Sequence, residues 1–199
     1  MDSIGKTLNY YNKNADLFKN DTVNVKFEEN QNILLKYLKI GDSILDLGCG
    51  AGRDAKIFID KGYTVTAIDG SEELCKIASY YIGQNIICKK FNDLDYKNKF
   101  EGIWACASLL HIEYSRLEEV FKKIVDAMKV KGHFYASFKY GKFEGYRSER
   151  YFTDFTEDKF NEFIKKLSNI KVLEYKVTAD ARIGRENEKW LNIIIEKDS

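Results

Sequence analysis

The chain has 199 residues, 44% of them hydrophobic and 14% aromatic, which is ordinary for a folded globular protein. Its 32 basic and 31 acidic residues leave a formal net charge of +1, and no long run of lysine or arginine stands out, so a nucleic-acid partner is not indicated. The N-terminal residues lack the apolar core of a signal peptide, and no apolar stretch is long enough to span a bilayer. We therefore expect a cytoplasmic protein with no membrane partner.

The length fits one domain over residues 1–199, and the sequence has no internal repeat. The cysteines form no C-x-x-C pair, and each falls in a glycine turn or in an element expected to be buried. They are Cys49, Cys75, Cys88 and Cys106. This usage is typical of reduced intracellular thiols, so we predict no disulfide and no metal site.

Two helices are expected before the first strand. Residues 6–20 have the spacing of a short amphipathic helix that carries Tyr10 and Tyr11, and residues 26–38 place leucines on one face of a second helix. Residues 1–40 are interpreted as N-terminal helices that include a lid over a ligand site. The alternative is that the two tyrosines only pack on the surface.

The stretch Ile44 to Asp54, ILDLGCGAGRD, predicts a buried strand, a glycine-rich turn and the start of a helix. The spacing of Gly48, Gly50 and Gly52 is G-x-G-x-G, which departs from the dinucleotide fingerprint G-x-G-x-x-G. A buried carboxylate at Asp46 would repel a pyrophosphate, but it would attract a ligand that carries an ammonium and a sulfonium group. The charge therefore favours S-adenosylmethionine over NAD.

A second strand is expected over residues 63–69, and it ends in Asp69, where a βαβ nucleotide-binding fold places a carboxylate on the ribose hydroxyls. The motifs DLGCGAGRD and TVTAIDGS resemble motifs I and II of the class I S-adenosylmethionine-dependent methyltransferases. The later strings FEGIWACASLLH, YASFKYG, RYFTDFT and EKWLN resemble a bacterial small-molecule branch of that family, related to the tellurite-resistance methyltransferases.

This resemblance covers nearly the whole chain and implies the fold class. We expect a single-domain, Rossmann-like α/β fold with a doubly wound, mostly parallel seven-stranded sheet. One strand would be antiparallel, and helices would cover both faces of the sheet.

The next elements complete the βαβ unit. Helices are expected over residues 53–61 and from the N-cap Ser71 to about residue 81, followed by a third strand over residues 85–91. The helix after the glycine turn points its free N–H groups at the turn, where they favour the carboxylate of a bound methionine group. The resemblance places adenine beside residues 92–94, although Asp93 has the alternative role of a turn-forming residue.

A fourth strand over residues 100–106 leads into the loop 107–111, at the carboxyl edge where open α/β sheets bind ligands. The loop lacks the Asn/Asp-Pro-Pro-aromatic signature of enzymes that methylate exocyclic amino groups of bases, which disfavours that activity. Ser115 and Glu118 predict a capping box for the helix that follows.

Gly132 is expected to end the next connection, and residues 133–138 predict a fifth strand in which His133 is structural. Residues 139–155 are the least periodic segment and are interpreted as a substrate loop, the alternative being an exposed connector without a special role. The last expected elements are a helix capped by Thr156 and an antiparallel pair of strands over residues 170–177 and 190–195.

Two sets of site residues are implied by the resemblance. The cofactor would be bound by Tyr11, Asp46, Gly48, Cys49, Gly50, Arg53, Asp69, Gly70, Ser71, Asn92, Asp93, Leu94, Ala107 and Ser108. The acceptor would be bound by Tyr10, Lys139, Tyr140, Arg150 and Tyr151, with Phe152 beside them. In the second set, Lys139 and Arg150 would offer positive charge to an anionic group.

His111 is the candidate catalytic residue, a general base, because an unperturbed histidine titrates near neutral pH and its loop faces the expected site. The alternative is a histidine held in a structural hydrogen bond. A base is needed only for a hydroxyl or a protonated amine, since a thiolate or another soft chalcogen anion requires positioning alone.

The leading hypothesis is a methyltransferase that uses S-adenosylmethionine, releases S-adenosylhomocysteine and acts on a small molecule. The alternatives are a methyltransferase acting on RNA or protein and a non-catalytic S-adenosylmethionine-binding domain, with a dehydrogenase less favoured. The short chain without a basic tract favours a small molecule, and residues 139–155 together with His111 favour catalysis. The sequence leaves open the acceptor and whether the chain is a monomer or a homodimer.

Overall fold

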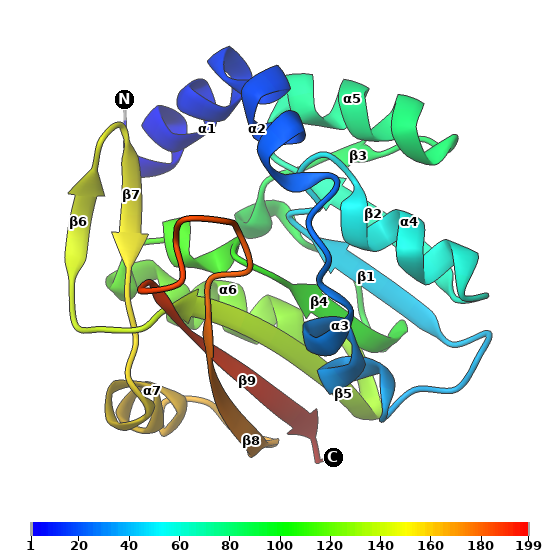
Figure 1. Ribbon diagram of the computed structural model, residues 1–199. Coiled ribbons are helices and arrows are strands. Elements are labelled where there is room, and N and C mark those ends of the chain that lie inside the picture. Colours follow the sequence, from blue (N-terminus) through cyan, green and yellow to red (C-terminus); the bar gives the residue numbers. More distant parts are fainter. Residues whose placement is uncertain (1, 199) are drawn as a thin grey trace.

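A seven-stranded sheet forms the centre of the computed structural model, which describes residues 2–198 (Figure 1). The strand order is β3-β2-β1-β4-β5-β9-β8, and among these described strands β9 alone runs against the others. The predicted fold class is confirmed. The strands are β1 (Ser43–Leu47), β2 (Thr64–Asp69), β3 (Ile87–Cys88), β4 (Phe100–Ala105), β5 (Met128–Lys139), β8 (Ile170–Ala179) and β9 (Lys189–Lys197).

Helices cover both faces of this sheet. They are α1 (Ser3–Lys13), α2 (Ala15–Thr22), α3 (Glu28–Leu35), α4 (Arg53–Asp60), α5 (Glu72–Ile82), α6 (Tyr114–Ala127) and α7 (Glu157–Ile164), with 3₁₀ turns at Phe91–Asp93 and Leu109–His111. No described helix has the length and apolar character that crossing a bilayer requires.

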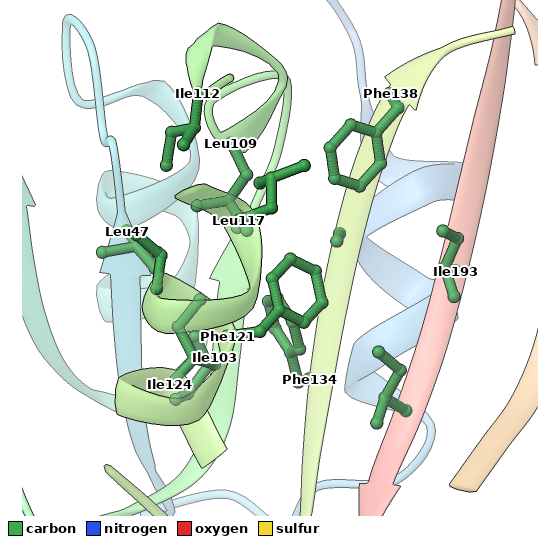
Figure 2. Packing of buried hydrophobic residues seen from close by; sticks show 14 of the residues in the cluster. Leu47, Ile103, Leu109, Ile112, Leu117, Phe121, Ile124, Phe134, Phe138 and Ile193 are labelled. Atoms are coloured by element: carbon green, nitrogen blue, oxygen red, sulfur yellow. The ribbon is translucent and has the colours of Figure 1, made fainter. Parts of the chain in front are cut away.

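The larger core lies between the sheet and α6 and α7. Leu117, Phe121 and Ile124 recur at helical spacing on α6 and are fully buried, where they face Phe134 of β5 and Ile193 of β9 (Figure 2). This apolar stripe fixes α6 on its face of the sheet, as its periodicity predicts.

The smaller core lies under α3 and α4 and is aromatic. The ring of Trp104 stacks on Tyr135 at 3.9 Å and meets the edge of Phe58 at 5.5 Å. Its indole Nε1 donates a hydrogen bond to Asp54 at 2.9 Å, so the core ends at a buried carboxylate next to the glycine turn.

The N-terminal residues differ from the expectation, because residues 6–20 form parts of two helices rather than one. Asn14 separates α1 from α2 with φ −116°, and its side-chain Nδ2 donates to the carbonyl of Tyr10 at 2.8 Å. An amide side chain that satisfies a carbonyl of the last turn ends a helix in this way. The second expected helix, residues 26–38, is shortened to α3.

The predicted capping box of α6 is wrong. The helix begins at Tyr114 with Glu113 at the N-cap and no side-chain cap within the described residues, and Ser115 lies inside the first turn. The backbone N–H of Tyr114 instead donates to Glu144 Oε1 at 3.0 Å. The acceptor comes from a distant segment, which a local motif does not reveal.

Gly132 does not end a connection but lies inside β5, which begins at Met128. A Cβ atom at Gly132 would lie 2.8 Å from the carbonyl of Lys129 and 3.1 Å from that of Phe100, beside an irregularity in the pairing of β4 with β5. Glycine is therefore required by close backbone approach.

The third strand is shorter than expected. It comprises two residues, and residue 91, the last of the expected strand, already belongs to a 3₁₀ turn at residues 91–93. Cys88 is exposed on this edge strand rather than buried.

Residues 139–155 are not an irregular loop, because they contain a β-hairpin formed by β6 (Glu144–Arg147) and β7 (Arg150–Thr153). Tyr146 and Tyr151 form a cross-strand edge-to-face pair at 5.3 Å. The hairpin stands beside α1 (Figure 1), and the N–H of Tyr151 donates to Thr7 Oγ1 of that helix at 3.1 Å. The two segments together form a roof over the carboxyl edge of the sheet.

Candidate functional site

A cavity of about 760 Å³ lies under this roof. Its walls come from the glycine turn, α1, α2, the segments after β3, β4 and β5, the hairpin, and the loop between β8 and β9. The predicted site residues that line it are Tyr11, Asp46, Gly48, Cys49, Gly50, Arg53, Asp69, Gly70, Asn92, Ala107, Ser108, His111, Lys139, Tyr140, Arg150 and Phe152. The predicted site residues outside its lining are Tyr10, Ser71, Asp93, Leu94 and Tyr151.

The glycine turn is held by contacts within the protein. Gly48 and Gly50 have φ of +85° and +55°, values that favour glycine. A Cβ atom at Gly48 would lie 2.5 Å from Ser108 Cβ, and one at Gly50 would lie 2.9 Å from the ring of Phe18. The glycines therefore allow α2 and the loop after β4 to close tightly around the turn.

Asp69, the last residue of β2, connects this strand to the glycine turn by a hydrogen bond. Its Oδ2 accepts a hydrogen bond from the N–H of Gly50 at 2.8 Å, and its Oδ1 accepts one from the N–H of Ser71 at 2.8 Å. Burial raises the pKa of Asp69, and hydrogen bonds from the N–H groups of Ser71, Gly50 and Gly70 oppose the rise. Ser71 lies behind this contact as the N-cap of α5, as predicted.

Asp54 is a buried carboxylate beside the glycine turn that accepts four hydrogen bonds, and the sequence reasoning did not assign it a role. It accepts bonds from Arg53 Nε at 2.9 Å and Arg53 Nη2 at 2.8 Å, from Gln31 Nε2 at 2.7 Å, and from Trp104. Burial would raise the pKa of Asp54, but the charge and hydrogen bonds of Arg53 bring it below its ordinary value. The signal in the sequence that could have indicated this role is the pair Arg53-Asp54 directly after Gly52.

Asp46 is buried with half of its carboxylate unsatisfied. It is 2% exposed, and among the described residues nothing hydrogen-bonds its Oδ2. Burial raises the pKa of Asp46 well above its usual range, and the negative charge of Asp54 raises it further. The cavity lining around the glycine turn thus contains three carboxylates, those of Asp46, Asp54 and Asp69, and the guanidinium of Arg53. This end of the cavity suits a cationic ligand.

The wall beyond the turn holds a second unsatisfied acceptor. Asn92 Oδ1 is buried without a hydrogen-bond partner in the described residues. Ala107 has φ +51° and donates its N–H to Ser137 Oγ at 2.8 Å, while Ser108 Oγ donates to the carbonyl of Leu47 at 2.7 Å. Asp93 lies in the 3₁₀ turn outside the cavity, in the position of a turn-forming residue.

Both ring nitrogens of His111 are engaged. Nδ1 lies 2.6 Å from the carbonyl oxygen of Tyr151, so this nitrogen must carry the proton, and Nε2 then accepts the hydrogen bond from the Tyr11 hydroxyl at 2.8 Å. Desolvation lowers the pKa of His111 to about 4, and the nearby charge of Arg150 acts in the same direction. The expectation of a pKa near neutral is therefore wrong.

Lys139 and Arg150, predicted as a pair of cations, differ in the structure. The Lys139 ammonium is paired with Glu188, lies 3.5 Å from Asp180 Oδ2 and sits over the ring of Trp190. Arg150 has no carboxylate within ion-pair distance in the described residues. The sequence reasoning missed the other charged residues that line this part of the cavity, which are Arg147, Asp154, Asp180, Arg182, Arg185, Glu188 and Lys189.

The two predicted tyrosines of the hairpin segment also point to different surroundings. Tyr140 is half exposed and donates its hydroxyl to Glu157 at 2.9 Å, while the hydroxyl of Tyr151 donates to Glu144 at 3.0 Å. Tyr10 packs against the Arg150 guanidinium at 4.7 Å from outside the cavity lining. His133 also lies outside it, stacked on Tyr37 at 4.5 Å.

A family model described as a methyltransferase domain matches residues 44–132. This match includes the glycine turn, Asp46, Asp69 and the loop that carries His111. The expected resemblance to class I methyltransferases is confirmed at this level, and the tellurite-resistance branch stays a prediction.

Two individual relatives also match the chain. An uncharacterised protein of Methanocaldococcus jannaschii is 33% identical over 124 residues, which cover 59% of this chain and 47% of that protein. The match thus spans about half the length of the archaeal relative. An uncharacterised methyltransferase of Staphylococcus carnosus is 23% identical over 189 residues, 87% of this chain and 91% of that protein.

The chain also resembles solved structures. The Burkholderia thailandensis 1,6-didemethyltoxoflavin-N1-methyltransferase, with bound 1,6-didemethyltoxoflavin and S-adenosylhomocysteine, superposes with a TM-score of 0.76. The two chains are 19% identical, and the match covers 96% of this chain and 85% of the other. At this identity the likeness shows the fold of the S-adenosylmethionine-dependent methyltransferases.

Asp69→Ala tests the structural role of this carboxylate. The substitution leaves the N–H groups of Gly50 and Ser71 without acceptors, so we expect a loss of about 2–3 kcal/mol in the free energy of unfolding without any ligand. Asp93→Ala is the matched control, because Asp93 lies outside the cavity lining, and should change stability by about 0.5 kcal/mol or less. Urea denaturation measures both, and equal stability of the two variants would contradict this role.

Proposed function

We propose that the chain is a methyltransferase that transfers a methyl group from S-adenosylmethionine to a small-molecule acceptor. The observation that carries the proposal is the buried, unpartnered Oδ2 of Asp46 at the glycine turn of a methyltransferase domain. It gives the cavity one acidic end for a cationic cofactor, while the other end, under α1 and the hairpin, holds the guanidinium of Arg150, which is unpaired among the described residues.

The residues around the turn fit S-adenosylmethionine. Asp46 Oδ2 would accept hydrogen bonds from its ammonium group, and the N–H groups at the start of α4 would favour its carboxylate. Asn92 Oδ1 would accept from the amino group of adenine, which would satisfy the other unpartnered acceptor of the described cavity lining. Asp69 would reach the ribose hydroxyls with lone pairs that its bonds to Gly50 and Ser71 leave free. When bound, the cofactor supplies a methyl group that is electrophilic because it is attached to a sulfonium.

The protein's own part in such a transfer is alignment and exclusion of water, because an in-line displacement needs its reactants held in one orientation. The roof provides both. Thr7 of α1 accepts the N–H of Tyr151, and Tyr11 of the same helix donates to His111. Two hydrogen bonds therefore join α1, the hairpin and the loop after β4 above the cavity.

A small acceptor is supported by the size and enclosure of the cavity. Its volume of about 760 Å³ lies within the range of roughly 300–1,000 Å³ that is typical of ligand pockets. The Burkholderia enzyme, named for a small-molecule acceptor, has the same fold over 96% of this chain. The net charge of +1 disfavours RNA as the acceptor.

Label transfer tests the proposed function. The protein is incubated with S-adenosylmethionine labelled in the methyl group and with the small-molecule, RNA and protein fractions of a cell extract. We expect the label only in the small-molecule fraction, and Asp46→Asn should reduce it by about 10-fold or more at limiting cofactor. Label in RNA or protein alone would contradict the small-molecule acceptor.

A pH–rate profile tests whether His111 is a general base or orients Tyr11. Because its pKa is lowered to about 4, the imidazole is neutral at neutral pH, and its Nε2 lone pair is already used by Tyr11. We expect no ascending limb between about pH 6 and 8 that depends on His111. A limb in that range that disappears in His111→Ala would show that the residue is the base.

The same pKa predicts how stability depends on pH. Protons bind His111 more weakly in the folded than in the unfolded state, so its contribution is full above about pH 6.5 and is lost as the pH falls through about 4. His111→Ala should therefore lose less stability than the wild-type protein between neutral pH and about pH 4. Parallel pH profiles of melting temperature would contradict the lowered pKa.

A further inference from the structure

The guanidinium groups in the cavity walls differ in how they are neutralised. Arg53 binds Asp54 through Nε and Nη2, and Arg182 binds Asp180 through the same two atoms at 2.9 and 2.6 Å. Arg147 holds Asp154 through its two terminal nitrogens. In these three cases a carboxylate of the chain occupies a two-pronged edge of the guanidinium.

Arg150 lacks such a carboxylate. Its Nε is buried and has no hydrogen-bond partner among the described residues, and its Nη1 lies 3.5 Å from the Tyr11 hydroxyl, at the outer limit of a hydrogen bond. A donor on a charged group that is buried without an acceptor is costly. Among the described residues, the fold therefore leaves this buried guanidinium of the cavity wall without an ion-pair partner.

Aromatic rings surround this guanidinium. Its central carbon lies 4.7 Å from the ring centre of Tyr10, 5.3 Å from that of Phe152 and 5.8 Å from that of Tyr11. Rings satisfy the faces of a guanidinium but not its in-plane N–H groups. Within the described residues, the Nε and Nη2 edge is left without a hydrogen-bond partner, and this is the same edge that binds a carboxylate in Arg53 and Arg182.

We infer that the methyl acceptor is a small organic acid whose carboxylate binds the Nε and Nη2 edge of Arg150. This inference rests on the proposed function and adds the chemical class of the acceptor. Lys139 does not take this role, because Glu188 and Asp180 neutralise it. Arg150 is thus the residue that selects an acid over an uncharged molecule of the same shape.

Binding of matched acids and amides tests the inference without turnover. The protein is saturated with S-adenosylhomocysteine and titrated with benzoate and benzamide, then with indole-3-acetate and indole-3-acetamide, in a calorimeter. We expect at least one acid to bind about 10-fold or more tightly than its amide, as one hydrogen-bonded charge pair provides. Arg150→Met should abolish that preference, and Arg150→Lys should retain part of it, because lysine keeps the charge but not the fork.

Lys142→Met is the matched control, because it removes an exposed positive charge from the same segment outside the cavity lining and should leave the preference unchanged. Binding of S-adenosylhomocysteine by each variant shows that it is folded. Failure of the wild-type protein to bind S-adenosylhomocysteine would contradict the proposed function itself. Normal binding of it, with no acid preferred over its amide or with equal effects of Arg150→Met and Lys142→Met, would overturn the inference alone.

Discussion

Three carboxylates buried around one glycine turn constrain the whole carboxyl edge of this sheet. Asp46, Asp54 and Asp69 are 2%, 7% and 8% exposed, and a carboxylate is buried at a large cost unless it is paired or hydrogen-bonded. Asp54 is satisfied by Arg53, Gln31 and Trp104, and Asp69 by backbone N–H groups. Asp46 keeps one oxygen unpartnered within the described residues, and burial beside Asp54 raises its pKa, so its charged form is destabilised unless a cationic partner binds.

The two ends of the cavity have opposite electrostatic character. The end at the glycine turn has the unsatisfied acid Asp46, and the end under the hairpin has the unpaired cation Arg150. The roof joins them, because the Tyr11 hydroxyl reaches His111 at 2.8 Å and lies 3.5 Å from Arg150. One residue of α1 therefore touches both the loop after β4 and the residue inferred to bind the acceptor, so closure of the roof and acceptor binding depend on the same contacts.

Much of the fold follows from local patterns in the sequence. The glycine turn, the N-cap at Ser71 and the apolar stripe on α6 each depend on residues that are neighbours along the chain, and the structure has all three. The hairpin at residues 144–153 escaped prediction because its strands carry mixed polarity and are stabilised by packing on α1. The contact at the start of α6 was not predicted either, because the N–H of Tyr114 donates to Glu144, which is distant in sequence.

The sequence likewise predicted many of the residues that line the site but not which contacts they make. Residue types and spacing brought Asp46, Asp69 and His111 to one cavity, but they did not reveal hydrogen-bond partners. Lys139 and Arg150 are equivalent cations in the sequence, and only tertiary structure shows that Glu188 neutralises the first. The low pKa of His111 likewise comes from burial under residues that are far away along the chain.

A binding cycle at Asp46 tests most directly whether this acid selects the cofactor by its charge. Calorimetry would measure the affinities of S-adenosylhomocysteine and of its deaminated analogue for the wild-type protein and for Asp46→Asn, with unfolding of each apo protein as a control. We expect either change alone to cost about 1.5–3 kcal/mol and both together to cost little more than one, because each removes the same charged hydrogen bond. Additive losses would contradict this, since they would show that the ammonium group binds elsewhere.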